Sequence, residues 1–239
     1  MKRICLWSSP RNISTALMYS FAQRSDTVVI DEPLYAHYLM NSDAEHPGRE
    51  EIILSMEYNP EKIVSEIILG NYEKEIVFLK QMTHHLINID ESFLYEVDNV
   101  FLIRDPERQI RSLSRVLKKV ELRDTGIKRQ FEIYEKLKSG NQNPVVIDSG
   151  EILRNPENSI SKLCSALNIP FEKNMLRWNP GPRKEDGIWA KYWYGSVHKS
   201  SGFELQNTGT EELSENLKSL YNECIQYYSE LHSVSIKAN

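Results

Sequence analysis

The sequence predicts an α/β fold, a three-layer sandwich in which a mostly parallel central sheet of about five strands has helices on both faces. Two observations support this prediction. Short apolar runs recur along the chain, and they are continuous rather than alternating, as in parallel strands covered on both faces. Stretches with helical spacing of apolar residues fall between these runs, and such alternation is typical of folds built on a parallel sheet.

Five apolar runs, each bounded by charged or turn residues, are the expected strands. They are Ile4 to Ser8, Thr27 to Ile30, Ile76 to Leu79, Val100 to Ile103 and Pro144 to Ile147. The expected helices are Ile13 to Arg24, Pro60 to Leu69, Pro106 to Lys119, Thr125 to Ser139, Asn155 to Leu167 and Thr210 to Leu231. We find no internal repeat or linker, so one domain covering residues 1–239 is expected.

The composition excludes several classes of protein. With 40% hydrophobic and 26% charged residues, the chain resembles an ordinary soluble globular protein. A formal net charge of −5 disfavours nucleic-acid binding. No apolar run approaches the roughly 20 residues of a membrane span, and no secretory leader is evident, so we expect a cytoplasmic protein. Three widely spaced cysteines indicate neither a disulfide framework nor a zinc site.

The turn after the first expected strand is rich in hydroxyl groups and contains an arginine. It reads Pro10-Arg11-Asn12-Ile13-Ser14-Thr15 and leads into an expected helix. A strand, a short polar turn and a helix N-terminus together form a site for phosphate, because free backbone N–H groups point at the anion. The glycine-rich lysine loop of nucleotide triphosphatases is absent from this turn.

Polar side chains also follow the next three strands. Glu32 follows the second strand, His84 and His85 follow the third, and Arg104 follows the fourth, with Ser112 eight residues further on. Ligands of open α/β sheets bind outside the carboxyl ends of the strands. We therefore expect these residues to meet at one edge of the sheet.

These motifs resemble those of the sulfotransferase family. The loop P-R-N-I-S-T is similar to the family's 5′-phosphosulfate loop, commonly P-[KR]-S-G-T-T, with Asn12 and Ile13 in place of Ser-Gly. Arg104-Asp105-Pro106 followed by Ser112 is similar to the 3′-phosphate element R-[ND]-P-x-x-x-x-x-S. The resemblance implies a P-loop-like fold and 3′-phosphoadenosine-5′-phosphosulfate as the donor cosubstrate, with no metal. It also implies a small-molecule or carbohydrate acceptor.

Three weaker elements extend the resemblance to about residue 190. Glu32-Pro33-Leu34 is similar to the family's E-P-[LF] element, and Thr83-His84 to its K-T-H segment. The tail from Arg183 and Lys184 to Trp189 is similar to R-K-G-x-x-G-x-W, which implies that Arg183 and Lys184 contact the donor. The tryptophans and lysines of this tail also suit a lid over the donor's adenine.

The chemistry of sulfuryl transfer assigns roles to these residues. Charge spreads over peripheral oxygens during the transfer, so positioning and electrostatics dominate, as in phosphoryl transfer. Arg11 is expected to contact the bridging and nonbridging oxygens of the phosphosulfate, where it has a catalytic role, together with the turn residues Asn12, Ile13, Ser14 and Thr15. Arg104 and Ser112 are expected to bind the second phosphate.

The candidates for the general base are Glu32, His84 and His85. His84 has a pKa suited to taking a hydroxyl proton near neutrality. We favour Glu32, because the E-P-L match is contiguous while Lys80 stands four residues before His84 rather than two. The residue before a proline is held extended, so we expect the carboxylate to be fixed at the strand end.

Two alternatives to a sulfotransferase site remain open: a structural role for some of these residues, and a different function of the domain. Ser14 and Thr15 could be helix caps, and Glu32 could cap a helix or pair with a neighbouring arginine. The alternative function is a P-loop-like small-molecule kinase or a nucleotide-binding module without activity. A kinase should have a lysine in its first loop and an acidic magnesium ligand, and an inactive module should lack a base.

Overall fold

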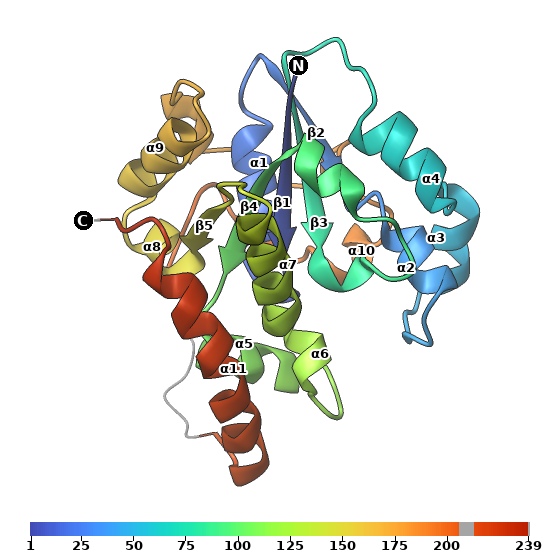
Figure 1. The fold of residues 1–239 in the computed structure, drawn as a ribbon, viewed down its shortest axis with the longest axis vertical. Coiled ribbons are helices and arrows are strands. Elements are labelled where there is room, and N and C mark those ends of the chain that lie inside the picture. Colours follow the sequence, from blue (N-terminus) through green and yellow to red (C-terminus); the bar gives the residue numbers. More distant parts are fainter. Residues whose placement is uncertain (206–212, 239) are drawn as a thin grey trace.

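The five expected strands form one parallel sheet in the computed structural model, which describes residues 1–205 and 213–238 (Figure 1). The strand order is β2-β3-β1-β4-β5. The strands are β1 (Lys2–Ser8), β2 (Thr27–Asp31), β3 (Ile76–Met82), β4 (Asp98–Ile103) and β5 (Val145–Asp148). The α/β prediction and all five strands are confirmed, although β3 continues three residues beyond its expected end.

Helices cover both faces of the sheet, as the continuous apolar strands require. Alternate residues of β1 point to opposite sides, so that Cys5 and Trp7 belong to one apolar core and Ile4 and Leu6 to the other. Helices α5 (Pro106–Ser114), α7 (Ile127–Ser139) and α11 (Glu215–Ser233) pack on the first core. Helices α1 (Ser14–Phe21), α8 (Ser149–Arg154) and α9 (Pro156–Ala166) pack on the second.

A third, smaller apolar cluster lies beside the β2 end of the sheet. It joins α2 (Tyr35–Met40) and α3 (Arg49–Ser55) to α10 (Ala190–Trp193). This helix lies in the tail segment, residues 178–203, whose apolar residues follow no clean helical or strand period. Trp189 and Tyr194 are buried in this cluster, at 2% and 6% exposure. The tail is thus packed against residues that follow β2, about 150 positions earlier in the chain.

Several helix boundaries differ from the sequence prediction. Helix α5 ends at Ser114 rather than Lys119, and the expected helix from Thr125 is split into α6 (Leu122–Thr125) and α7 at Gly126. Gly126 has φ +67°, and a Cβ there would lie 2.9 Å from the Cβ of Ser9. The expected helix from Pro60 begins as α4 (Pro60–Lys62) and continues as a π-helical segment, η1 (Ile63–Ile68). Residues 210–212, where the last helix was expected to begin, lie outside the described residues.

Short elements complete the chain. The 3₁₀ turns are η2 (Thr83–His85), η3 (Ser92–Glu96), η4 (Lys173–Leu176) and η5 (Val197–Lys199). Within residues 1–205 and 213–238, no helix has the length and apolar character to cross a bilayer. No group of three or more His, Cys, Asp or Glu side chains in the same ranges is arranged to hold a metal ion.

Candidate functional site

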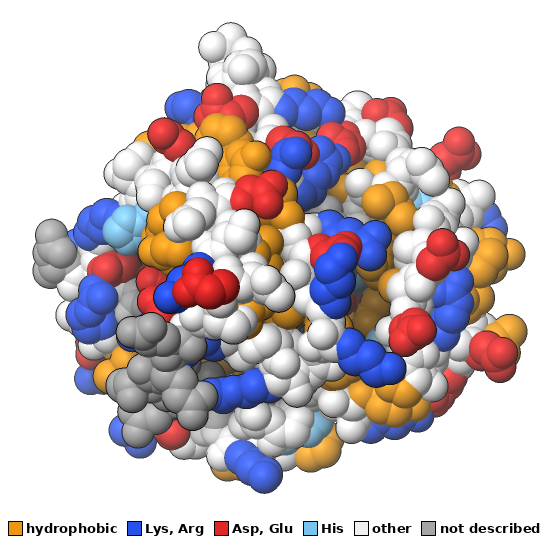
Figure 2. All heavy atoms as spheres, turned by 90° about the horizontal axis from the view of Figure 1, so that it is seen from below, with side chains coloured by type: hydrophobic (Ala, Val, Ile, Leu, Met, Phe, Trp, Pro, Cys, Tyr) orange, Lys and Arg blue, Asp and Glu red, His pale blue; other side chains and the backbone are white. Residues whose placement is uncertain are grey.

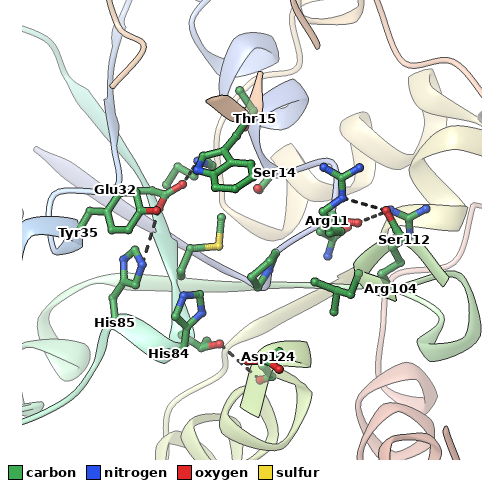
Figure 3. A pocket seen from close by; sticks show the side chains of 18 of the residues that line it. Arg11, Ser14, Thr15, Glu32, Tyr35, His84, His85, Arg104, Ser112 and Asp124 are labelled. Atoms are coloured by element: carbon green, nitrogen blue, oxygen red, sulfur yellow. Dashed lines mark hydrogen bonds and ion pairs between the residues drawn. The ribbon is translucent and has the colours of Figure 1, made fainter. Parts of the chain in front are cut away.

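A cleft of about 1610 Å³ opens at the carboxyl ends of the strands. Figure 2, which views the molecule from this end, shows Lys and Arg side chains gathered around a hollow. Ten of the expected site residues line the cleft: Arg11, Asn12, Ile13, Ser14, Thr15, Glu32, His84, His85, Arg104 and Ser112. Figure 3 shows Arg11, Arg104 and Ser112 on one side, and Glu32 with the two histidines on the other.

The two expected anion-binding elements contact each other directly. Arg11 Nε donates a hydrogen bond to Ser112 Oγ at 2.9 Å, and the Arg104 guanidinium donates to the backbone carbonyl of Arg11. Arg11 has φ +61°, a left-handed conformation that is uncommon outside glycine. This turn of the backbone accompanies the contact between the loop after β1 and the start of α5.

Asn12 fixes the conformation of this loop through hydrogen bonds of its side chain. Its Oδ1 accepts a hydrogen bond from the Ile13 amide at 2.9 Å, and its Nδ2 donates to the Leu102 carbonyl of β4 at 2.9 Å. The loop is therefore held to the neighbouring strand by a side chain. The Ile13 amide, one of the N–H groups expected to face an anion, already has a partner within the loop.

Ser14 and Thr15 stand in the first turn of α1 and are not its caps. The N-cap is Ile13, which makes no side-chain capping bond. The first amides of a helix have no acceptor within the helix. Ser14 and Thr15 therefore line the cleft together with backbone N–H groups of this turn, as in a phosphate site, and the Thr15 side chain also contacts Tyr194.

Positive charge at this side of the cleft is only partly offset by the protein, through Asp105 and Asp148 near Arg104. Neither Arg11 nor Arg104 takes part in an ion pair within the described residues. Burial and the nearby cations of Arg108 and Arg11 lower the pKa of Arg104 to about 10. Bringing like charges together costs free energy, and a bound polyanion would offset this cost.

Glu32 stands at the opposite side and is 5% exposed. Its Oε1 accepts a hydrogen bond from Lys80 Nζ, and its Oε2 lies 3.8 Å from His85 Nε2. The expectation of an extended backbone at Glu32 is wrong, because φ is +43°. The strand ends here in a turn, in which the Tyr35 amide donates to the Glu32 carbonyl at 2.9 Å.

The base candidates differ in their affinity for a proton. Burial, with the negative charge of Asp31, raises the pKa of Glu32 to about 7 against the opposing effect of Lys80. Burial lowers the pKa of His84 to about 4, and burial with nearby His84 and Lys80 lowers that of His85 well below its usual value. Both imidazoles are therefore neutral near pH 7. Their Nδ1 atoms are buried and make no hydrogen bond within the described residues.

Comparisons with known proteins place the chain in a family. The model of the sulfotransferase domain matches residues 1–234. The chain belongs to the sulfotransferase family. The fold of this sulfotransferase domain is similar to that of the sulfotransferase domain from the curacin biosynthetic pathway, at 17% identity with a TM-score of 0.55 over 93% of this chain and 96% of that one. A sulfotransferase from Alicyclobacillus acidocaldarius matches at 11% identity and a TM-score of 0.56, over 98% and 95% of the two chains.

Two curated relatives come from Arabidopsis thaliana. Branched-chain-amino-acid aminotransferase-like protein 1 is 41% identical over 198 residues, which cover 82% of this chain and 36% of that protein. Branched-chain-amino-acid aminotransferase-like protein 2 is 36% identical over 230 residues, 96% of this chain and 41% of that one. The sulfotransferase domain described here thus spans well under half the length of these relatives.

The tail residues expected to contact the donor are not brought to the cleft. The Arg183 guanidinium lies over the ring of Tyr19, 4.6 Å from its centroid, and Lys184 is an exposed side chain beside Glu185. Asp186 fixes this segment, because it accepts hydrogen bonds from Tyr19 OH at 2.6 Å and from the Arg183 amide at 2.9 Å. Trp189, Trp193 and Lys199 do line the cleft. The role of Arg183 and Lys184 toward the donor stays a prediction.

Sequence reasoning missed the partners of Glu32. Lys80 lies inside β3 and is 0% exposed, and its ammonium also contacts Asp31 and Tyr194. A signal for this cluster was present: Asp31 and Glu32 are adjacent at one strand end, and Lys80 directly extends the apolar run of the neighbouring strand. Tyr194 gave no such signal, because it comes from the tail without a clean period.

Proposed function

We propose that this domain transfers a sulfuryl group from 3′-phosphoadenosine-5′-phosphosulfate to a hydroxyl or amine of a small-molecule or carbohydrate acceptor. The new S–O or S–N bond forms as the bond from sulfur to the 5′-phosphate oxygen breaks. The proton of the acceptor goes to a base of the enzyme, and 3′-phosphoadenosine-5′-phosphate leaves.

The observation that carries the proposal is the contact between two anion-binding elements that are distant in the sequence. Arg11 and Ser112 are joined by a hydrogen bond, and Arg104 holds the carbonyl of Arg11. The donor has phosphate groups at both ends of its ribose, so it needs two such elements in one cleft. Arg11, with Ser14 and Thr15, suits the 5′-phosphosulfate, and Arg104 with Ser112 suits the 3′-phosphate.

The opposite side of the cleft supplies the chemistry for the acceptor. Glu32, His84 and His85 line it, and all three are base candidates. The raised pKa of Glu32 is close to the value that favours proton transfer near neutral pH. A base facing two anion sites also favours an enzyme over a nucleotide-binding module without activity.

Calorimetric titration with 3′-phosphoadenosine-5′-phosphate, compared with ATP and magnesium, tests the proposal without knowledge of the acceptor. We expect the bisphosphate to bind equally well with EDTA and with magnesium. A hundredfold excess over its Kd should stabilise the fold by about 2.7 kcal/mol. Equal or stronger stabilisation by ATP with magnesium would favour the small-molecule kinase instead.

A further inference from the structure

The ammonium group of Lys80 is fully used by neighbouring side chains. Its Nζ donates to Asp31 Oδ1 at 2.7 Å, to Tyr194 OH at 2.7 Å and to Glu32 Oε1. A lysine ammonium has three donors. No donor of Lys80 is left for a ligand unless one of these hydrogen bonds breaks. Lys80 is therefore placed to organise protein groups rather than to contact the donor.

Asp31 and Tyr194 complete this buried cluster. Asp31 Oδ2 accepts hydrogen bonds from Tyr194 OH at 2.7 Å and from the Gly187 amide at 3.1 Å. Tyr194 OH also accepts from Trp189 Nε1 at 3.1 Å. With Lys80, the Asp31 carboxylate thus has three donors, two of which come from the tail segment.

The two carboxylates of the cluster are not equivalent. Asp31 accepts hydrogen bonds from three donors. Glu32 accepts one from Lys80, and His85 Nε2 lies further away, 3.8 Å from Glu32 Oε2. Hydrogen bonds to a carboxylate favour its ionised form. The protein thus supplies three donors to Asp31, and Glu32 is the carboxylate left to bind a proton.

The charge count of the cluster leads to the same conclusion. Two carboxylates and one ammonium give a net charge of −1 when all are ionised, and their side chains are 1–7% exposed. An uncompensated buried charge is costly. One proton brings the cluster to neutrality, so the site has the capacity for one proton from the acceptor.

We infer that Asp31, Lys80 and Tyr194 are positioning residues that make Glu32 the single proton acceptor of the site. This inference rests on the proposed function. As sulfur leaves the 5′-phosphate oxygen and bonds to the acceptor, the acceptor's proton moves to a Glu32 oxygen. The 5′-phosphate oxygen leaves with the electron pair of the broken bond.

The other titratable groups around Glu32 do not compete for this proton. His85 faces it from η2 and Tyr35 from α2, and Tyr194 follows α10. Burial raises the pKa of both tyrosines above the usual value, so they stay neutral. The lowered pKa values of His84 and His85 make them weak proton acceptors.

The titration of Glu32 tests the inference directly. The carboxyl ¹³C shift of Glu32, assigned by its loss in Glu32→Gln, is followed against pH in the wild type and two variants. Lys80→Met removes the cation and should raise the Glu32 midpoint by about 1–3 units. Asp31→Asn removes the competing anion and should lower it. A merely structural role would not move the midpoint in opposite directions.

A matched control and a binding measurement complete the test. Lys2→Met removes a lysine that pairs with Asp98 at 2.9 Å, at the amino end of β1, and should leave the Glu32 midpoint unchanged. All variants should bind 3′-phosphoadenosine-5′-phosphate with wild-type affinity. If Lys80→Met does not fold, the Glu32 midpoint measured in Asp31→Asn tests the inference alone. An unchanged midpoint in Asp31→Asn, or a large loss of bisphosphate affinity in Lys80→Met, overturns the inference.

Discussion

The two sides of the cleft handle charge in opposite ways. On the donor side, Arg11 and Arg104 form no ion pair within the described residues, and the cations of Arg11 and Arg108 lie near Arg104. On the acceptor side, every donor of Lys80 has an acceptor within the protein, and its anionic partners are buried. The first arrangement leaves charge to be neutralised by a ligand. The second has a net charge of −1 when its two carboxylates and its ammonium are ionised, and one proton neutralises it.

This difference suggests that the two sides of the cleft contribute to different steps of the reaction. In the proposed function, the donor side supplies binding energy and stabilises charge on the leaving phosphate. In the same proposal, the acceptor side takes the acceptor's proton and should contribute little to donor affinity. Substitutions on the two sides should therefore separate affinity from turnover.

The largest expected effect is on turnover, from Glu32→Gln. The amide cannot take the acceptor's proton, so the rate should fall about 10²–10⁴-fold, while affinity for 3′-phosphoadenosine-5′-phosphate stays unchanged. Turnover is measured at saturating donor with an acceptor found by screening phenols, alcohols and amines.

His84→Ala and His85→Ala are the matched comparison for Glu32→Gln, since both histidines line the same side of the cleft. Smaller losses are expected from both, because burial has lowered their pKa values. Near-full activity in Glu32→Gln, with a large loss in one histidine variant, transfers the role of base to that histidine.

The next effect is on the donor side. Arg104→Ala should weaken binding of the bisphosphate by about 1.5–3 kcal/mol, because a charge-assisted contact to the 3′-phosphate is lost. Arg11→Ala should reduce turnover more than donor affinity, because Arg11 is placed for the phosphate on which charge develops. Calorimetry with the bisphosphate measures the first effect, and rates at saturating donor measure the second. Intact binding in both variants would locate the donor site elsewhere.

The sequence predicted the donor side better than the acceptor side, for a physical reason. The loop after β1 and the start of α5 are contiguous motifs directly after strands, and the parallel sheet brings all strand ends to one edge. The sheet itself followed from five apolar runs. Short helices such as α2 and α8 were not predicted, because a few residues contain too little periodicity.

Part of the acceptor side depends on a contact that no local pattern encodes. Lys80 was placed after its strand because an apolar run was expected to end at Leu79, whereas β3 continues to Met82. A lysine can continue a buried strand only when its charge is compensated, and the compensation comes from Asp31 and Tyr194. Tyr194 lies 163 residues after Asp31. Spacing within one segment cannot reveal such a contact.

The smallest expected effect concerns the tail, where the sequence motif and the geometry point to different roles. Lys184→Ala should change affinity for 3′-phosphoadenosine-5′-phosphate by less than about fivefold, the equivalent of about 1 kcal/mol, because its side chain is exposed and lies outside the cleft lining. Arg183→Ala should act more on stability, because its guanidinium packs over the Tyr19 ring. Calorimetry and thermal unfolding of both variants measure these effects. Losses of affinity as large as that of Arg104→Ala would mean that the segment around Asp186 releases Tyr19 and closes on the bound donor, so that the donor side has a third anion-binding element.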